Sequence, residues 1–233
     1  MSIRTVSIAG TLCLLVASGC ARTEVAEAPT ADDGQGTTVV TDPLPPRVQA
    51  FAWDCNDGLA VVSQLDADTD ELWLFLPTET VKLAHLAAAS GAKYGSDDIS
   101  FWSKGEEAML AANGMNRKCS VNRFRSNIES IKLSGGDFWA VGNEPGWSLE
   151  IYSDWLVLTT GYGEQRHEVL ITGRSEDRTA QPYAFRGMAG DEEIVVELRA
   201  GPCFDTMSGE EFETAVEIDL GEQHLIGCGT ALH

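Results

Sequence analysis

The chain has 233 residues, with 36 acidic and 16 basic side chains and a formal net charge of −20. That balance disfavours nucleic acid and anionic lipid surfaces as partners, and it favours solubility or a cationic partner. Solubility alone is a sufficient reason for such a charge.

The first twenty residues have the pattern of an export signal. They carry one positive charge, Arg4, and no acid, followed by the apolar run I-A-G-T-L-C-L-L-V-A. This run has the length of a signal-peptide core and is too short for a transmembrane helix. It ends in V-A-S-G-C, which resembles a bacterial lipobox, so we expect residues 1–19 to be removed and Cys20 to be lipidated. An ordinary secretory signal is the alternative.

The residue after the expected lipidation site is Ala21. By resemblance to bacterial lipoproteins, an aspartate there would go with retention in the inner membrane. We therefore expect an outer-membrane lipoprotein that faces the periplasm. Several acyl chains on Cys20 would anchor it more firmly than a single chain.

Residues 21–49 contain no aromatic residue and are rich in Ala, Thr, Pro and Asp. Such a segment buries too little apolar surface to offset the entropy of ordering. Together with the lipidated cysteine, it predicts a flexible tether over residues 20–49. A random coil of that length spans on the order of 30 Å.

About 185 residues follow the tether, enough for one larger domain or two small ones. In an oxidising compartment the four remaining cysteines can pair in three ways. One pairing staples two consecutive segments of small-domain size and so favours two domains. It joins Cys55 to Cys119 and Cys203 to Cys228.

The two domains that we expect cover residues 50–122 and 136–233. The first has 11 acidic and 5 basic side chains, a net charge of −6, and the second has 19 and 5, a net charge of −14. Between them, residues 123–135 are mostly polar and end in Gly-Gly. This composition predicts an inter-domain linker.

Residues 50–122 predict short β-strands. The stretch F-A-W-D-C alternates apolar and polar residues, which is the period of a half-buried strand. Further apolar segments follow at close, even spacing, divided by N-D-G, D-A-D-T-D, K-G and N-G. This pattern favours a small antiparallel barrel or sandwich. One segment, V-K-L-A-H-L-A-A-A, also fits a short helical turn that ends at Ser90-Gly91.

Four features of this domain resemble, in order and spacing, the membrane-bound inhibitors of c-type lysozyme: W-D-C-N-D-G, A-S-G-A-K-Y, F-W-S-K-G-E-E-A and a late cysteine. The resemblance covers about 70 residues. It implies an eight-stranded antiparallel barrel tied by a Cys55–Cys119 disulfide. It also implies that two loops enter the lysozyme cleft, and that the site residues are Ser90, Gly91, Tyr94, Lys104 and Gly105.

The chemistry of the two loops agrees with this implication. A lysozyme cleft holds one carboxyl group that acts as a general acid and one carboxylate that stays ionised. A plug should offer a neutral hydrogen-bonding group to the first and a cation to the second, and Ser90 and Lys104 supply them. Gly91 and Gly105 let the backbone turn sharply. An acidic domain would also attract a cationic lysozyme.

Ser-Gly and Lys-Gly are also common turn dipeptides, and either alone is ordinary loop chemistry. An enzymatic alternative makes Ser90 a nucleophile and Lys104 its base. The S-x-x-K spacing of Ser/Lys enzymes is absent, however, and a lysine base must be desolvated to lose its proton. Four nearby acidic residues tend to keep the lysine charged, so we expect no enzymatic activity.

Residues 136–233 also predict β-strands divided by turns such as G-Y-G, M-A-G-D and L-G-E. The stretches N-E-P-G-W and C-F-D-T-M-S-G resemble a domain of uncharacterised bacterial envelope lipoproteins, and no activity follows from that resemblance. Three polar residues among these turns, Glu144, Asp205 and Ser208, define a candidate binding mouth at one end of a barrel.

A structural interpretation of the same stretches is the one we favour. In it, Asn143 and Pro145 shape a tight turn, Trp147 packs in the core, and Asp205 caps a short turn after Cys203. No histidine spacing typical of a metal site occurs, so the sequence predicts no metal and no cofactor.

The sequence thus predicts an all-β, lipid-anchored protein with two small barrels or sandwiches, each holding one disulfide. Its expected function is inhibition of c-type lysozyme by insertion of loops into the active-site cleft. A non-inhibitory solute-binding or structural envelope lipoprotein is the alternative. The sequence assigns neither an oligomeric state nor a role for residues 136–233.

Overall fold

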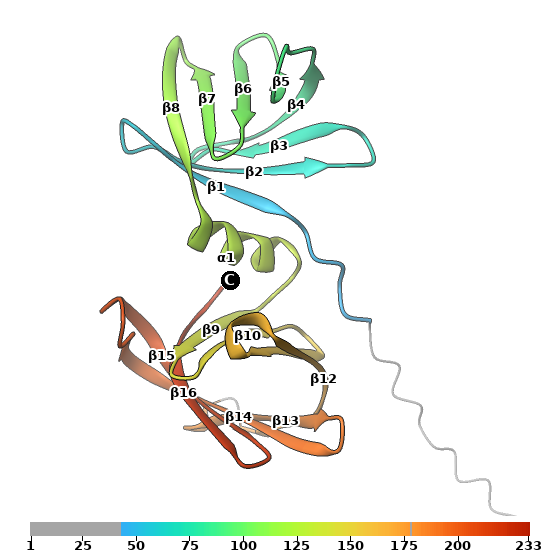
Figure 1. The fold of residues 1–233 in the computed structure, drawn as a ribbon, viewed down its shortest axis with the longest axis vertical. Helices are drawn as coiled ribbons and strands as arrows, with labels where there is room; N and C mark the ends of the chain where they lie inside the picture. Colours follow the sequence, from blue (N-terminus) through green and yellow to red (C-terminus); the bar gives the residue numbers. More distant parts are fainter. Residues whose placement is uncertain (1–42, 178) are drawn as a thin grey trace, which may run out of the picture. The chain divides into compact units, whose positions relative to one another are not determined.

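The computed structural model describes residues 43–177 and 179–233. The expected signal peptide, the lipidation site Cys20 and the tether up to residue 42 lie outside the described residues. The described chain folds into two closed barrels, each of eight antiparallel strands (Figure 1). The predicted all-β class is confirmed, and closure into barrels decides between barrel and sandwich. No helix among the described residues is long and apolar enough to cross a membrane.

The first barrel pairs its strands in chain order and closes by pairing the first strand with the last. The strands are β1 (Ala50–Cys55), β2 (Ala60–Asp66), β3 (Glu71–Phe75), β4 (Thr80–Leu86), β5 (Ala92–Gly95), β6 (Ile99–Lys104), β7 (Glu107–Ala112) and β8 (Met115–Asn122). The segment that also fitted a helical turn is β4, which pairs with β3 and β5. Closure makes Cys55 and Cys119 direct partners on β1 and β8, and their disulfide is confirmed.

The core of the first barrel follows the two-residue period of its strands. Trp53, Leu74, Leu83 and Phe101 are almost completely buried in the interior. The Trp53 ring meets the Phe101 ring edge-on at 5.4 Å, an arrangement that aromatic pairs favour. The Trp53 indole nitrogen donates to Ser63 Oγ at 2.8 Å, so its burial leaves no unpaired donor.

The second barrel has the same topology: its strands pair in chain order, and β9 pairs with β16 to close it. Its elements are β9 (Phe138–Asn143), β10 (Gly146–Ile151), β11 (Trp155–Thr160), the short 3₁₀ turn η1 (Gly161–Gly163), β12 (Gln165–Arg174), β13 (Tyr183–Ala189), β14 (Glu192–Phe204), β15 (Glu211–Leu220) and β16 (Gln223–Ala231). Leu149, Leu158 and Ile218 are fully buried in its core. The predicted Cys203–Cys228 disulfide joins β14 to β16 and is confirmed.

The segment expected to be a linker forms the helix α1 (Arg123–Leu133). Asn122 caps its start, since its side-chain oxygen accepts from the Arg125 backbone N–H at 3.0 Å. Gly135, with a φ of +83°, follows its end, as glycine commonly does after a helix. The two capping residues can be recognised in the sequence, but the segment has few apolar residues, and its composition is that of a connector.

Two serines of α1, and a third that caps its C-terminal end, bind the backbone of β1 and of the chain just before it. Ser126, Ser130 and Ser134 accept from the N–H groups of Ala52, Ala50 and Val48 at 2.8, 3.0 and 2.7 Å. Four helical residues rise about 6.0 Å and two strand residues about 6.6 Å, so the two periods match. We call this set of contacts the serine ladder. It gives hydrogen-bond partners to backbone N–H groups at the start of β1 and just before it.

The chain just ahead of β1 is also held. Arg47 pairs with the buried Glu150 carboxylate of β10 and donates to Asn127 Oδ1 of α1 at 2.6 Å. Glu150 also accepts from the Tyr152 hydroxyl at 2.8 Å, which leaves this buried charge well partnered. The tether that we expected through residue 49 therefore ends earlier, because Arg47 and Val48 already contact the fold.

Candidate functional site

The two glycine-containing loops singled out in the sequence lie side by side at one end of the first barrel. Ser90 and Gly91 end the connection between β4 and β5, whereas Lys104 ends β6. Ala92 of β5 pairs with Ser103 of β6, so Gly91, which precedes Ala92, lies next to Lys104, which follows Ser103. A Cβ built on Gly91 would lie 3.2 Å from Lys104 Cβ. The strand register thus brings together two loops that are fourteen residues apart in the sequence.

Close packing makes glycine necessary at position 91. Its φ is +71°, which other residues adopt only with strain, and a Cβ there would lie 2.3 Å from Ser103 O. Gly105 has a φ of +62° and stands first in the two-residue turn between β6 and β7, a place where hairpins favour glycine. A Cβ on Gly105 would meet nothing within 4 Å. The first glycine permits contact between the loops, and the second permits the turn.

Trp102 ties the two loops together, and the sequence reasoning missed it. Its indole nitrogen donates to Ser90 O at 2.8 Å, and its ring remains 41% exposed. The two-residue period of strands could have identified Trp102, because Phe101 is buried in the core and the next side chain along the strand points outward. Trp102 therefore fixes the backbone of the Ser90 loop while it stays accessible beside it.

Lys104 is exposed, and it makes no ion pair within the described part of the chain. Glu107 stands opposite it in the strand ladder without closing a salt bridge. Glu106 is engaged elsewhere, in an ion pair with Arg123. The ammonium group is thus available to a partner in a domain whose surface is otherwise mainly acidic.

Tyr94 lies in the core and not on the loop surface. It stands in β5, is 5% exposed, and stacks against His85 with the ring centroids 5.1 Å apart. Burial raises the pKa of its hydroxyl, and the charge of Asp70 raises it further. The structure therefore separates Tyr94 from the four exposed site residues and places it where it supports β5 from within.

A shallow groove of about 640 Å³ adjoins Lys104. It runs across β1, β8, β7 and β6 and is lined by Asp54, Cys55, Asn56, Trp102, Lys104, Glu107, Ala108, Met109, Lys118, Cys119 and Ser120. Trp102 and Met109 are exposed apolar side chains within it. The site thus combines two projecting loops with a partly apolar surface next to them.

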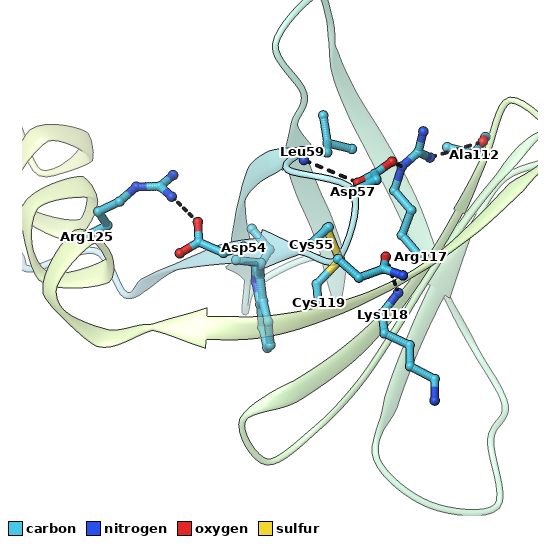
Figure 2. The surroundings of a disulfide bond; sticks show 12 residues. Asp54, Cys55, Asp57, Leu59, Ala112, Arg117, Lys118, Cys119 and Arg125 are labelled. Atoms are coloured by element: carbon cyan, nitrogen blue, oxygen red, sulfur yellow. Dashed lines mark hydrogen bonds and ion pairs between the residues drawn. A yellow bond between two sulfur atoms is a disulfide. The ribbon is translucent and has the colours of Figure 1, made fainter.

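The strands behind the groove are braced by the disulfide and by an ion pair (Figure 2). Arg117, which is largely buried, donates from Nε to Asp57 Oδ2 at 2.6 Å. This hydrogen bond lowers the pKa of the Asp57 carboxyl, and the Leu59 backbone N–H at 3.2 Å also favours its charged form. Figure 2 also shows Asp54 paired with Arg125 of α1. These contacts fix β1 against β8 and the first turn.

In the second barrel, Asp205 and Ser208 belong to one tight loop. Asp205 Oδ1 accepts from the N–H groups of Met207 and Ser208 at 3.1 and 2.6 Å, and from Ser208 Oγ at 2.7 Å. Asn143 donates to Asp205 Oδ2 at 2.5 Å. The Ser208 bonds lower the pKa of the Asp205 carboxyl more than any other contact. Asp205 is therefore the turn cap that the structural interpretation described.

Glu144 lies in the turn between β9 and β10, directly before Pro145, and the peptide bond between them is cis. Trp147 is buried in the core of the second barrel, as the structural interpretation expected. Glu144 and Asp205 line the same small hollow of about 390 Å³, but Ser208 does not. No group of three or more His, Cys, Asp or Glu side chains over residues 43–177 and 179–233 is arranged to hold a metal ion.

The geometry of the first barrel defines a class of protein: a small, disulfide-bonded β-barrel that presents a hydroxyl and an unpaired ammonium on two adjoining loops. Residues 53–118 match the family of the membrane-bound lysozyme-inhibitor of c-type lysozyme, and the first barrel is a domain of this family. The matched range contains both loops. No match was found among curated proteins or among solved structures.

Proposed function

We propose that the first barrel inhibits c-type lysozyme by inserting its two loops into the active-site cleft. The observation that carries this proposal is the adjacency of the Ser90 hydroxyl and the unpaired Lys104 ammonium at one end of a barrel of this family. The barrel then acts as a plug. It forms no covalent bond with the enzyme and performs no catalysis.

The two side chains suit the two carboxyl groups of the cleft. Lys104 donates a charge-assisted hydrogen bond to the ionised carboxylate, worth about 1.5–3 kcal/mol, whereas a neutral bond from Ser90 to the general acid is worth about 0.5–1.5 kcal/mol. Lys104 breaks no salt bridge when it binds lysozyme, because it makes none within the described residues. The larger contribution should therefore come from the lysine.

Preorganisation supports the same mechanism. The Trp102–Ser90 hydrogen bond and the packing of Gly91 on Ser103 hold the first loop before a partner arrives. Little loop entropy is then lost on binding. In this proposal Tyr94 contributes from inside the barrel by holding β5, and Gly105 contributes through the turn that presents Lys104.

We extend the proposal to the cellular setting and the division of the chain. Removal of residues 1–19 and acylation of Cys20 would anchor the protein in the outer membrane, facing the periplasm. The chain then consists of a tether, the inhibitor domain over residues 50–122, a connecting segment over 123–135 and a second domain over 136–233. The family description, which names a membrane-bound inhibitor, supports a location in the cell envelope.

The test is a titration of c-type lysozyme activity on cell walls with the fragment 41–233, which forms one compact unit. We expect stoichiometric inhibition by the parent, weakened about tenfold or more in Lys104→Ala and less in Ser90→Ala. Lys132→Ala is the matched control, because it removes an exposed lysine of α1 outside the barrel. An oligosaccharide that occupies the lysozyme cleft should compete with the fragment and weaken its binding to the enzyme.

Two results would sink the proposal. One is a folded, disulfide-bonded parent that does not inhibit. The other is inhibition that Lys104→Ala and Lys132→Ala lower equally, because that would indicate general charge attraction and not insertion into the cleft.

A further inference from the structure

The second barrel carries a hollow of about 580 Å³ that the proposed function does not use. It lies between the β9–β10 turn, the η1 turn and the loop that contains Asp205. Its lining residues are Phe124, Val141, Gly142, Asn143, Gly146, Trp147, Ser148, Thr159, Tyr162, Gly163, Asp205, Met207, Ser208, Glu210 and Phe212. The volume is in the range of small-molecule sites.

Tyr162 is an exposed aromatic ring held in a fixed place at the edge of this hollow. It is 86% exposed, yet its φ is +57°, a conformation that a non-glycine residue adopts only with strain. Its ring packs on Gly146, where a Cβ would lie 2.5 Å from ring atom Cε1. Its hydroxyl donates to Asn143 O at 3.2 Å. One part of the ring is thus fixed against the backbone, and most of it faces solvent.

Several polar groups that line the hollow have no partner in the described residues. Ser148 and Thr159 stand opposite each other on β10 and β11, and neither hydroxyl makes a hydrogen bond there. The indole nitrogen of Trp147 is buried and likewise unpaired. By contrast, Asp205 already accepts hydrogen bonds on both carboxylate oxygens. Unused hydroxyl groups therefore lie in the same hollow as an exposed aromatic ring.

The charges of the lining select among ligands. The described lining includes no lysine and no arginine, so an anionic ligand would meet Asp205 and Glu210 without a compensating cation. A strongly cationic ligand is also poorly matched, because Asp205 is engaged and only Glu210 offers a carboxylate without a hydrogen-bond partner there. A neutral ligand with an apolar face and several hydroxyl groups fits best.

We propose that this hollow binds a neutral carbohydrate. One pyranose ring stacks on Tyr162, and its hydroxyl groups bond to Ser148, Thr159 and Glu210. The inference is independent of lysozyme inhibition, since it concerns another barrel and other residues. It gives a function to a part of the chain for which the sequence assigned none.

The test is calorimetric titration of fragment 41–233 with two neutral probes, the trisaccharides of N-acetylglucosamine and of glucose, and with one sulfated oligosaccharide. We expect at least one neutral probe to bind and the sulfated one not to bind. Tyr162→Gly should weaken binding about tenfold, and glycine tolerates the positive φ, so the turn is preserved. Tyr162→Phe keeps the ring and should bind nearly as the parent does.

Two further variants distinguish the loss of a binding contact from a general disturbance of the fold. Thr159→Val removes one unpaired hydroxyl from the wall of the hollow and should weaken binding several-fold. Phe204→Ala is the matched control, because it removes an exposed aromatic ring of the same barrel that does not line the hollow. A pull-down with purified peptidoglycan distinguishes two sources of the carbohydrate, the cell wall and free sugars. Retention that depends on Tyr162 indicates cell-wall glycan, whereas binding of trisaccharide alone indicates a free sugar.

The proposal is overturned if neither neutral probe binds, or if the sulfated probe binds as well as they do. It is also overturned if Tyr162→Gly and Thr159→Val both bind as the parent does. Lysozyme inhibition measured on the same samples reports separately on the first barrel.

Discussion

Replacing Gly91 by Ala should damage both the stability of the first barrel and its inhibitory loop, whereas Gly105→Ala should affect stability only modestly. Each residue has a positive φ, so each substitution costs about 1–2 kcal/mol in backbone strain. At Gly105 the new methyl group enters open space. At Gly91 it would lie 2.3 Å from Ser103 O, so the loop or the β6 backbone must also move. We therefore expect Gly91→Ala to lose roughly 1–3 kcal/mol more than Gly105→Ala.

The assay is denaturant unfolding of the two variants, together with lysozyme inhibition. The displaced loop in Gly91→Ala also strains the Trp102–Ser90 hydrogen bond, so inhibition should fall by more than the loss of stability explains. Equal unfolding free energies for the two alanine variants would refute the reasoning, since they would mean that the contact at Gly91 carries no energy.

Two other predictions concern stability. Ser130→Ala removes the middle contact of the serine ladder and leaves the buried Ala50 N–H unpaired, so the unfolding free energy should fall by about 1–3 kcal/mol. Ser96→Ala, at an exposed serine, should change it little, and similar losses in both would contradict the ladder's role. Asp57 has a pKa lowered from 3.8 in the folded state, chiefly by Arg117, so its contribution to stability is complete above that value and is lost as pH falls through the folded pKa. The stability difference between the parent and Asp57→Asn, followed by thermal unfolding, should therefore narrow as pH falls below about 4; a constant gap would argue against the pairing.

The strand content of the fold could be predicted because alternation and turn residues are local signals. Those local signals do not show closure, which depends on pairing between β1 and β8, and between β9 and β16, strands that are distant in the sequence. For the first barrel the family resemblance implied a closed barrel, and for the second barrel the sequence left barrel and sandwich open. The helix α1 was missed for a different reason. Part of its stabilisation comes from serine hydroxyls bound to a strand, which hydrophobic periodicity does not register, and part comes from apolar contacts such as those of the fully buried Ile131.

The candidate site was partly predictable. The sequence names Ser90 and Lys104, but only the pairing of Ala92 with Ser103 shows that their loops adjoin. Tyr94 belongs to the motif A-S-G-A-K-Y together with the loop residues, but its position in the strand directs its side chain into the core. Trp102 stands in a motif that we quoted, yet its role depends on a hydrogen bond to a backbone oxygen across two strands. Such a contact has no signature in residue types.

The serine ladder has a mechanical consequence. A pull on the N-terminal side of the folded part reaches Arg47 and Val48 first, and only then the pairing of β1 with β2, which begins at Ala50. The load passes along β1 to the contacts at Val48, Ala50 and Ala52 in turn. Helix α1 therefore bears part of a force applied to the N-terminal side of β1 before that force reaches the strand pairing of the barrel.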